Sequence, residues 1–463
     1  MTDELLNPRC VCWTVFICLS LVGIPAALAQ KAPSFEVGEP FGVMDVAADE
    51  ANVATNTTQP EILITTFDTQ NAFGFNDPIT GELAVSALLG RFIDPATLQP
   101  RGEPFIILGD PDGNLDTHEV DYNPVTNQYV VVATAEGYRP QGKDIPLVAL
   151  VDAGTGKVTK AFAYMADTPQ EFDDVSVAVN PKNGDFLLIA EYDFPNAEGT
   201  NVEGVIAALF DKGGNLLTKE FGRIDTLEPD RDEDDPDGAY IPGSNVFVVI
   251  TNIDPTTSPN LITATVVQPV PDASGNLQLG PQTIVSELRK DVSTGHADVI
   301  ENPFNGEVII AFNYNSGNDG GDLSYYKVGD NGSLTKVRDQ VFYFDAESNF
   351  PFGHRHPQLA VDTKTGTIIV SHSARSGGIV RGMVFSLLGP DGNVLPGREE
   401  ECPYTAAETE TDVSDSANNH DVAYDPFSGS YMIVWTAGNA IQGVRVKVTS
   451  NYLPEDVNNW MMY

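Results

Sequence analysis

A repeat of about sixty residues constrains the fold of this chain more than any other feature of the sequence. Each copy has a polar residue, a short apolar stretch, an Asn-Pro or Asp-Pro pair, a glycine turn and a strongly apolar strand. The proline, or Thr363 in one copy, stands five residues before that strand. The six clear copies begin at His118, Asp174, Asp235, His296, His356 and His420. A weaker seventh copy begins at Asp45 and leads to the apolar segment 61–67.

Each copy continues with a third strand, a glycine hairpin and a fourth strand, as in residues 205–221. Glycine suits such hairpins because it adopts positive φ without steric cost. The mature chain has no helical periodicity of useful length. Four-stranded units in tandem predict an all-β fold, a seven-bladed β-propeller with about 62 residues per blade. The last copy lacks its fourth strand, so we expect the N-terminal segment 34–41 to supply it and close the ring.

In these features the chain resembles the seven-bladed β-propeller superfamily, in the form of bacterial extracellular propellers with an Asn-Pro/Gly turn between the first two strands. The resemblance covers nearly the whole mature chain and concerns the fold. No tryptophan-aspartate, kelch or sialidase Asp-box signature is present, and no specific enzyme family is indicated. Propellers of this kind include glycan-active enzymes, lectins and scaffolds, so the fold does not select a function.

The N-terminus is typical of an export signal. An apolar run at 13–25 leads to Ala27 and Ala29, which predicts cleavage after Ala29. An uncleaved anchor helix is the alternative, although the run is short for a membrane span. We therefore expect a signal peptide at 1–29, the propeller at 30–449 and a C-terminal tail at 450–463. The mature protein would be secreted or periplasmic, without membrane insertion. Cys402 would be its only cysteine, which excludes an intrachain disulfide.

The chain is strongly acidic, with 25 Lys and Arg against 66 Asp and Glu and a formal net charge of -41. Such a charge repels nucleic acid and anionic lipid, so neither is an expected partner. A glycan or another small molecule is the expected ligand. General adaptation to a salty environment is the alternative explanation of the acidity, and no oligomeric state follows from the chain.

Aligning the copies on the proline predicts a ring of oxygen ligands, because the first strand of each blade lines the central channel. The ring residues, five positions before the proline, are Asp45, Glu119, Ser176, Asp237, Asp298, Gln358 and Asp421. Two positions earlier stand Asp174, Asp235, His296 and His356. Residues two apart share one side of a strand, and the intervening His118 and His420 point the other way.

Crowded carboxylates repel one another, so either their pKa values rise or a cation lies among them. Oxygen ligands favour Ca²⁺, and the participation of His296 and His356 would favour Zn²⁺ or Mn²⁺ instead. The alternative is that each Asp caps backbone N–H groups at the start of its blade. A second candidate for Ca²⁺ is the loop that spaces Asp110, Asp112 and Asp116; a solvated acidic loop is its alternative.

Residues 352–357 form the best catalytic candidate. His354 and His356 offer an imidazole base and Arg355 a guanidinium that neutralises a carboxylate, as β-elimination from a uronate requires. An ion pair between Arg355 and the acidic ring is the alternative. Further ligand-binding candidates on the same face are Tyr138, Arg139, His372 and Arg375.

The sequence thus predicts an exported, metal-binding propeller that recognises a glycan or small ligand on a face rich in His and acids. A metal-assisted polysaccharide lyase or hydrolase on that face is one alternative, and a non-catalytic extracellular scaffold is another.

Overall fold

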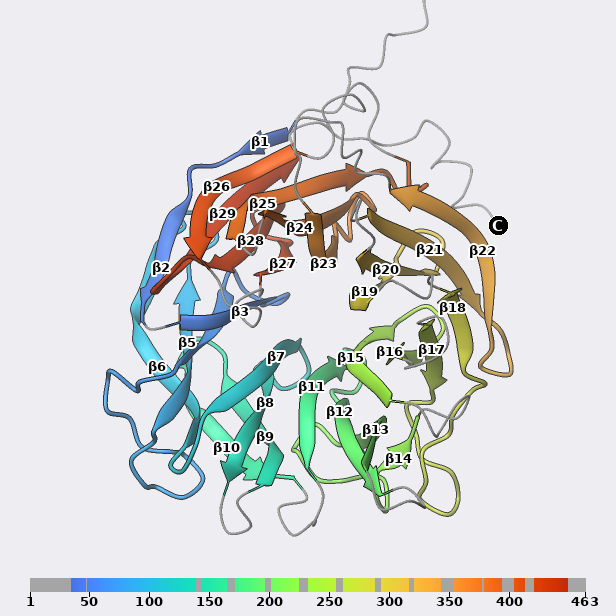
Figure 1. Cartoon of the computed structure of the whole chain (residues 1–463), viewed down its shortest axis with the longest axis horizontal. Coiled ribbons are helices and arrows are strands. Elements are labelled where there is room, and N and C mark those ends of the chain that lie inside the picture. Colours follow the sequence, from blue (N-terminus) through green and yellow to red (C-terminus); the bar gives the residue numbers. More distant parts are fainter. Residues whose placement is uncertain are drawn as a thin grey trace, which may run out of the picture.

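The computed structural model describes the following parts of the chain: residues 35–46, 48–138, 143–164, 171–195, 201–224, 232–254, 261–287, 293–315, 320–342, 353–376, 379–393, 404–412 and 420–448. The predicted signal peptide, the tail 450–463 and Cys402 lie outside these ranges. The described residues form β-strands in seven antiparallel sheets, arranged around a central axis (Figure 1). Within these ranges, no helix has the length and apolar character that crossing a membrane requires. The predicted seven-bladed β-propeller is therefore confirmed.

Each of the first six blades is a sheet of four strands. Blade 1 holds β3 (Ala48–Thr55), β4 (Ile62–Asp68), β5 (Ser86–Ile93) and β6 (Pro100–Asp110). Blade 2 holds β7 (Leu115–Asn123), β8 (Gln128–Tyr138), β9 (Lys143–Asp152) and β10 (Val158–Ala163). Blade 3 holds β11 (Phe172–Val179), β12 (Phe186–Pro195), β13 (Asn201–Phe210) and β14 (Gly222–Arg223).

The second half of the ring repeats this order. Blade 4 holds β15 (Asp232–Ile241), β16 (Val246–Asp254), β17 (Leu261–Val267) and β18 (Thr283–Glu287). Blade 5 holds β19 (Ser293–Asn302), β20 (Glu307–Asn315), β21 (Gly320–Val328) and β22 (Leu334–Phe342). Blade 6 holds β23 (Gly353–Val361), β24 (Ile368–Ser376), β25 (Ile379–Leu388) and β26 (Tyr404–Asp412).

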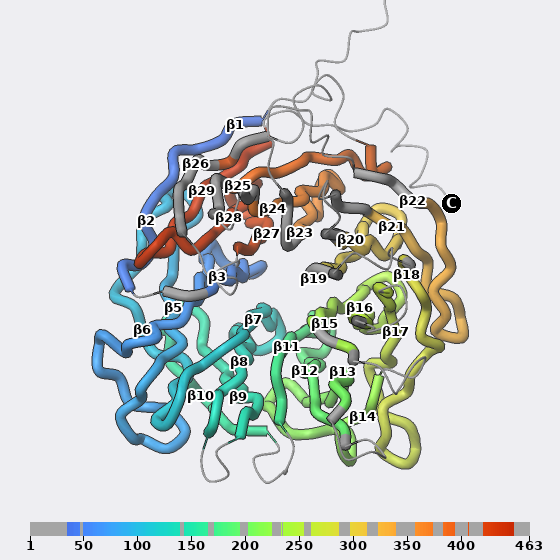
Figure 2. The backbone as a smooth tube through the Cα atoms, in the orientation of Figure 1, coloured from blue at the N-terminus to red at the C-terminus, as the bar shows by residue number. Residues whose placement is uncertain are grey.

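Blade 7 joins the two ends of the chain. Its inner strands are β27 (His420–Asp425), β28 (Ser430–Thr436) and β29 (Ala440–Val448), and the outer edge of β29 pairs with β1 (Phe35–Val37) and β2 (Phe41–Asp45). Figure 2 shows these N-terminal strands running along β29. The N-terminal segment therefore closes the ring as predicted, and it protects an edge that would otherwise be open to other strands.

The core lies between the blades. The middle strands β4, β17 and β28 are buried along their whole length because neighbouring blades cover both faces of each sheet. This double burial explains why the second strand of each repeat is a continuous apolar run without alternation.

Blade 1 corrects the sequence alignment. Its innermost strand β3 begins at Ala48, so the copy starts after Asp45. The segment Asn52–Asn56 corresponds to Glu119–Asn123, and the Asn56 N–H donates to the Glu61 carbonyl just as the Asn180 N–H donates to the Asp185 carbonyl. The turn therefore has the ordinary length, although it lacks the proline that marks five of the other copies.

Candidate functional site: the acidic axial cavity

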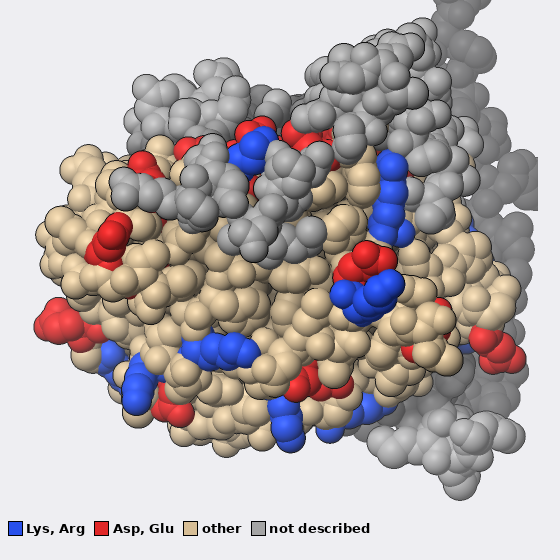
Figure 3. Space-filling view, turned by 90° about the horizontal axis from the view of Figure 1, so that it is seen from below, with Lys and Arg blue, Asp and Glu red and all other residues tan. Residues whose placement is uncertain are grey.

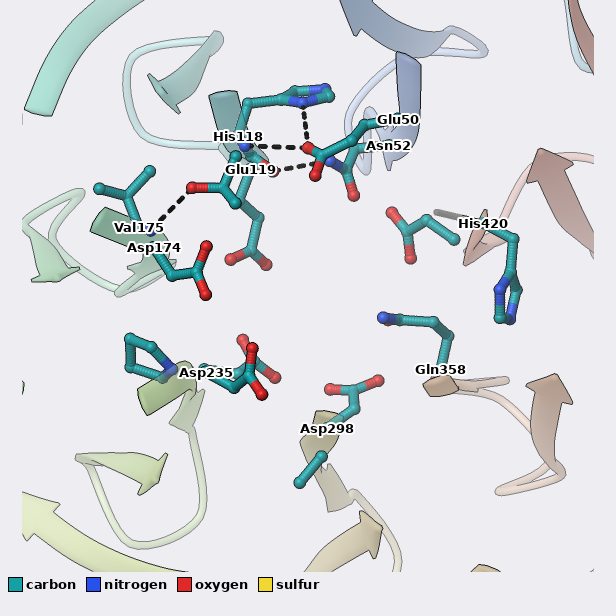
Figure 4. Close-up of a pocket in the computed structure, with 15 residues that line it drawn as sticks. Glu50, Asn52, His118, Glu119, Asp174, Val175, Asp235, Asp298, Gln358 and His420 are labelled. Carbon is teal, nitrogen blue, oxygen red and sulfur yellow. Dashed lines mark hydrogen bonds and ion pairs between the residues drawn. The ribbon is translucent and has the colours of Figure 1, made fainter. Parts of the chain in front are cut away.

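The innermost strands of the seven blades surround a cavity of about 140 Å³ on the axis (Figure 4). Seven carboxylates line this axial cavity: Glu50, Glu119, Asp174, Asp235, Asp237, Asp298 and Asp421. The other polar residues around it are Asn52, Thr117, His118, Gln358 and His420. No Lys or Arg is among the described residues that line it. The cavity thus concentrates acidic groups without a compensating basic side chain from the lining.

An inner ring of polar residues occupies one equivalent position in every blade. In the innermost strands of blades 1 to 6, each member lies just after a β-bulge: directly after it at Asn52 and Gln358, and one residue later at Asp298. The members of this inner ring are Asn52, Glu119, Ser176, Asp237, Asp298, Gln358 and Asp421. The structure therefore brings together six of the seven residues that the alignment grouped.

Asp45 is the exception. It lies on β2, opposite Ala440 on the outer edge of blade 7, and its side chain is exposed. Its predicted place in the ring is wrong, because Asp45-Val46 resembles Asp421-Val422 in sequence although its strand belongs to the closing edge. Asn52 holds the equivalent position in blade 1, and an alignment on Asn56 in place of a proline would have found it.

The inner ring joins each blade to the next through backbone N–H groups. Asp421 Oδ2 accepts a hydrogen bond from the Val53 N–H at 2.8 Å. Glu119 Oε2 accepts one from the Val177 N–H at 3.3 Å. Asp298 Oδ2 accepts one from the Leu359 N–H at 2.5 Å. In each case the donor follows the inner-ring position of the next blade by one residue, so one pattern recurs at three blade boundaries.

The alternative stated in the sequence analysis, in which an Asp caps backbone N–H groups, is thus present. The capped N–H groups belong to the next blade as well as to the blade of the Asp itself. Asp421 Oδ1 accepts a hydrogen bond from its own neighbour, the Val422 N–H, at 2.6 Å, so this carboxylate bridges two blades. At two other boundaries the donor is an uncharged side chain of the inner ring: Asn52 Nδ2 donates to the His118 carbonyl at 2.7 Å, and Ser176 Oγ donates to Asp237 Oδ1 at 3.1 Å. The inner ring therefore has a structural role whatever else it binds.

An upper tier of acids lies two residues before the inner ring and faces the same cavity. It contains Glu50, Asp174 and Asp235. Glu50 and Asp235 adopt φ values of 50° and 47°, a left-handed conformation that is uncommon for residues other than glycine. Such strain persists only where the surrounding structure imposes it, here at the β-bulges that turn these residues toward the axis. The sequence analysis missed Glu50 because it misaligned blade 1.

His118 is turned away from the axis, as the strand alternation predicted. Its ring packs against Phe67 of blade 1 at a centroid distance of 4.5 Å. Its Nδ1 lies 3.0 Å from Glu50 Oε2, and its Nε2 lies 3.0 Å from Thr65 Oγ1. Because both ring nitrogens have partners in blade 1, His118 orients Glu50 toward the cavity.

Burial raises the pKa of the axial carboxyl groups. The pKa of Glu119 is well above its usual value because of burial and then the charge of Asp237. The pKa of Asp298 is raised in the same way. The pKa of Asp421 rises to about 7 because of burial, although two backbone N–H groups oppose the shift. In the upper tier, burial and then the charge of Asp235 raise the pKa of Asp174. Near neutral pH the cavity therefore retains protons that exposed carboxylates would lose.

A second cavity of about 380 Å³ lies on the other side of the inner ring. Glu119, Asp237, Asp298, Gln358 and Asp421 line both cavities, so the ring separates them. The walls of the second cavity are mainly apolar, with Val, Ala, Leu and Pro side chains and the rings of Tyr122 and Tyr240. One further carboxylate, Asp121, lines this second cavity, and its Oδ2 accepts a hydrogen bond from the Val179 N–H at 2.8 Å.

The donor set of the axial cavity suits a hard cation. Carboxylate and amide oxygens are the ligands that Ca²⁺ and Mg²⁺ prefer. Within the described part of the chain, no three His, Cys, Asp or Glu side chains converge closely enough to hold a metal ion by themselves. An ion here would therefore bind one or two carboxylates and complete its shell with water. Zn²⁺ or Mn²⁺ would need His296 and His356, whose side chains lie outside the described structure.

The predicted catalytic group lies at the start of β23. His354 and Arg355 stand opposite Ala374 and Ser373 of β24, and a β-bulge follows. The side chains of His354, Arg355, His356 and Arg375 are outside the described structure, as is the whole of Arg139. Their roles remain predictions.

Two of the predicted ligand-binding residues are buried. His372 is 2% exposed in the middle strand of blade 6, opposite Val384. Tyr138 is 5% exposed, and its hydroxyl donates to Asp77 Oδ2 at 3.3 Å. Neither side chain is presented to a ligand on the open face.

The predicted Ca²⁺ loop is divided between two places. Asp110 and Asp112 lie close to Asp77: burial, followed by the charges of Asp112 and Asp77, raises the pKa of Asp110 to about 6. Asp116 is exposed, and its charge acts instead on Asp174 in blade 3. The structure thus separates Asp116 from the other two loop residues.

Comparison with known proteins identifies the fold. No protein-family profile and no curated protein sequence matches the chain. A protein of unknown function from Dyadobacter fermentans has a similar structure, with a TM-score of 0.51 at 12% identity over 89% of this chain and 99% of that chain. An alpha-L-arabinofuranosidase from Lactobacillus brevis matches with a TM-score of 0.37 at 11% identity over 65% of this chain and 97% of that chain. The likeness to the Dyadobacter protein concerns the fold alone, and the strand order identifies the chain as a seven-bladed β-propeller of four-stranded blades.

Proposed function

We propose that this chain is an exported, cation-binding β-propeller. Its axial cavity would hold a divalent cation, with Ca²⁺ as the expected ion, and the face around the cavity would recognise a glycan or a small ligand. Export rests on the predicted signal peptide at 1–29. The observation that carries the proposal is the gathering of seven carboxylates around one axial cavity whose described lining has no Lys or Arg.

The electrostatics support a cation. Each raised pKa means that the ionised carboxylate is disfavoured in the folded protein, mainly because burial removes it from water. A bound cation would reverse this effect by stabilising the ionised forms. The cavity volume of about 140 Å³ accommodates an ion with several water molecules. Cation binding would therefore release protons, and the affinity would rise with pH.

The charges of the axial cavity differ from those on one outer side of the molecule. On the side seen in Figure 3, Asp and Glu alternate with Lys and Arg in small groups. The dense acidic cluster lies instead at the axis, where carboxylates are costly to bury. A sugar hydroxyl can replace water on a bound Ca²⁺, which gives a direct route from the cation to glycan recognition.

Calorimetric titration of the mature chain with Ca²⁺, after removal of metal by a chelator, tests the proposal. We expect tighter binding at about pH 8 than at about pH 6, because ionisation of Asp421 crosses its pKa of about 7. The enthalpy should depend on the buffer, since protons are released. The double variant Asp298→Asn with Asp421→Asn should lose this pH-dependent binding of Ca²⁺.

The matched control is Asp425→Asn, the same substitution at the other end of β27, which should bind as the wild type does. Equal binding by the double variant and the wild type would contradict the proposal. For the ligand, glycan binding should be lost in chelator and in the double variant; binding that persists in both would disprove a cation-dependent recognition.

A further inference from the structure

The second cavity, on the turn side of the inner ring, has the size and the lining of a small-molecule site. Its volume of about 380 Å³ lies in the range that such sites occupy in proteins. Pro124, Pro181 and Pro242 line it and belong to the turns that follow the innermost strands. The cavity therefore runs from the inner ring toward the turn end of the propeller, on the side opposite to the axial cavity.

The walls are apolar because the innermost strands carry small or apolar side chains beyond the inner ring. One residue after the ring, Val53, Val177 and Leu359 line the cavity. Two residues after the ring, the lining residues are Ala54, Asp121, Ala239, Ile300 and Ala423. Most of these are alanines, whose short side chains leave the space open. An apolar molecule that enters this space leaves water for apolar surroundings, which favours binding.

Asp121 breaks this apolar pattern in blade 2. It stands two residues after Glu119 on β7 and shares its side of the strand. Its Oδ1 accepts a hydrogen bond from the Tyr122 N–H at 2.6 Å, and its Oδ2 accepts one from the Val179 N–H of blade 3 at 2.8 Å. These bonds fix the carboxylate at the blade boundary and use one of the two lone pairs on each oxygen. The carboxylate can therefore accept further hydrogen bonds from a ligand.

The acidic end of the second cavity has no counter-charge from its described lining, in which no Lys or Arg is present. The carboxylates of this lining are Glu119, Asp121, Asp237, Asp298 and Asp421. Blade 2 contributes two of them, and no other blade contributes more than one. Lys182 lies at the rim, where its exposed Nζ donates to the Pro242 carbonyl at 2.7 Å and water screens its charge. A positively charged ligand thus complements the acidic end.

The combination of acidic end and apolar walls selects a class of ligand. A metal ion would use the oxygens at one end and leave the apolar walls without a partner. An uncharged apolar molecule would contact the walls and leave the carboxylates uncompensated. An ammonium group on an apolar body matches both parts, because its N–H groups donate to carboxylate oxygens while the body contacts the walls.

We propose that the second cavity binds a small organic ammonium ion, a primary amine on an apolar body, with its nitrogen against Asp121 and the inner ring. The apolar body extends toward the turn end, along Val177, Ala239 and Leu359. This amine site is distinct from the proposed cation site, because Asp121 and Ala239 line the second cavity and not the axial cavity. The two sites share carboxylates of the inner ring and take different ligands from opposite sides.

Calorimetric titration in chelator with matched probes tests the amine site. The probes are 2-phenylethylammonium, the uncharged 2-phenylethanol of the same shape, and methylammonium, which has the charge without the apolar body. We expect 2-phenylethylammonium to bind with a stoichiometry of about one, and the other two probes to bind at least about tenfold more weakly. Equal binding of 2-phenylethanol, equal binding of methylammonium, or no binding of 2-phenylethylammonium would each overturn the proposal.

Two variants place the amine in the second cavity. Asp121→Asn removes a charge and keeps an acceptor oxygen, whereas Ala239→Ile narrows the cavity with the side chain that blade 5 carries at the equivalent Ile300. Each should weaken the binding of 2-phenylethylammonium about tenfold or more. The matched control Asp272→Asn, on an exposed loop outside both cavities, should bind as the wild type does. Wild-type affinity in both Asp121→Asn and Ala239→Ile would contradict the site.

Melting temperatures and Ca²⁺ binding give separate readouts. Melting without ligand shows that each variant folds, and 2-phenylethylammonium should then raise the melting temperatures of the wild type and Asp272→Asn more than those of Asp121→Asn and Ala239→Ile. Equal increases in all four proteins would contradict the site. Ala239→Ile should bind Ca²⁺ as the wild type does, because Ala239 is outside the axial cavity. Since the amine titrations contain chelator, failure of the amine to bind contradicts the amine site alone, and failure of Ca²⁺ to bind contradicts the axial site alone.

Discussion

The two ends of the innermost strands use polar side chains in different ways. Asp421 and Asp425 stand at opposite ends of β27. Asp425 accepts hydrogen bonds from the Ser428 N–H at 2.7 Å and the Phe427 N–H at 3.3 Å, both within its own turn. Asp421 reaches instead to the Val53 N–H of the next blade. One residue type thus caps a turn at one end and joins two blades at the other.

Charge also differs between the two ends. At the turn end, lysines join blades: Lys182 Nζ donates to the Pro242 carbonyl at 2.7 Å, and Lys364 Nζ donates to the Pro426 carbonyl at 2.6 Å. These lysines are exposed and remain hydrated. At the axial end, the half-buried carboxylates of Glu119, Asp298 and Asp421 perform the same task. The comparison predicts that the Asp421 joint at the axis responds to protonation, whereas the lysine joints at the turns do not.

The largest expected effect is a loss of stability with rising pH in chelator. Because Asp421 has a pKa of about 7 when folded and an ordinary value when unfolded, the folded state binds more protons. The resulting stabilisation is complete below about pH 4 and is lost as the pH rises through about 7, up to about 4 kcal/mol for this group. Urea denaturation at a series of pH values measures it.

Asp421→Asn separates this group from the other acids. The variant should have a flatter dependence of the unfolding free energy on pH than the wild type. If the wild-type free energy is constant from about pH 4 to about pH 8 in chelator, the buried carboxyl groups at the axis do not titrate as described.

An intermediate effect is expected from Asp425→Ala at the turn end. The substitution removes the acceptor for the Phe427 and Ser428 N–H groups, and we expect a loss of about 1–2 kcal/mol in the free energy of unfolding at neutral pH. Chemical denaturation measures it, and Asp425→Asn, which keeps an acceptor oxygen, is the control. A loss as large for Asn as for Ala would show that capping is not the cause.

The smallest effect is expected from Lys364→Met. The variant keeps the aliphatic length and removes the hydrogen bond from Nζ to the Pro426 carbonyl. Because the lysine is exposed, we expect a loss of about 0.5 kcal/mol or less, independent of pH between about 5 and about 8. A loss comparable to that of Asp425→Ala would mean that this inter-blade contact matters more than its exposure suggests.

Most of the fold could be predicted from the repeat. The one error in that prediction, the alignment of blade 1, has a physical explanation. Six copies share a proline, or Thr363 in one of them, at a constant distance from an apolar strand, which fixes the register of their innermost strands. Blade 1 lacks that proline, so Asp45-Val46 was mistaken for Asn52-Val53. The strand that carries Asp45 pairs with β29, about four hundred residues away in sequence, and local sequence does not reveal such a partner.

The candidate site could be predicted in part. The period of two residues correctly predicted that Asp174 and Asp235 lie above the inner ring. It also predicted that the His118 side chain points away from the axis. The period did not reveal which N–H each carboxylate accepts, that Glu50 belongs to the upper tier, or that Asp77 lies beside Asp110. These relations join different blades or loops, where no periodic pattern operates.

The sequence by itself determined the blades, because the alternation and the turns of each repeat act over a few neighbouring residues. Only the tertiary structure decided the chemistry of the axis. Asp421 and Val53 are 368 residues apart in the chain, and ring closure brings them within 2.8 Å. The pKa of a carboxyl group depends on its burial and on the charges around it, and both arise only when seven strands from distant parts of the chain meet at one axis.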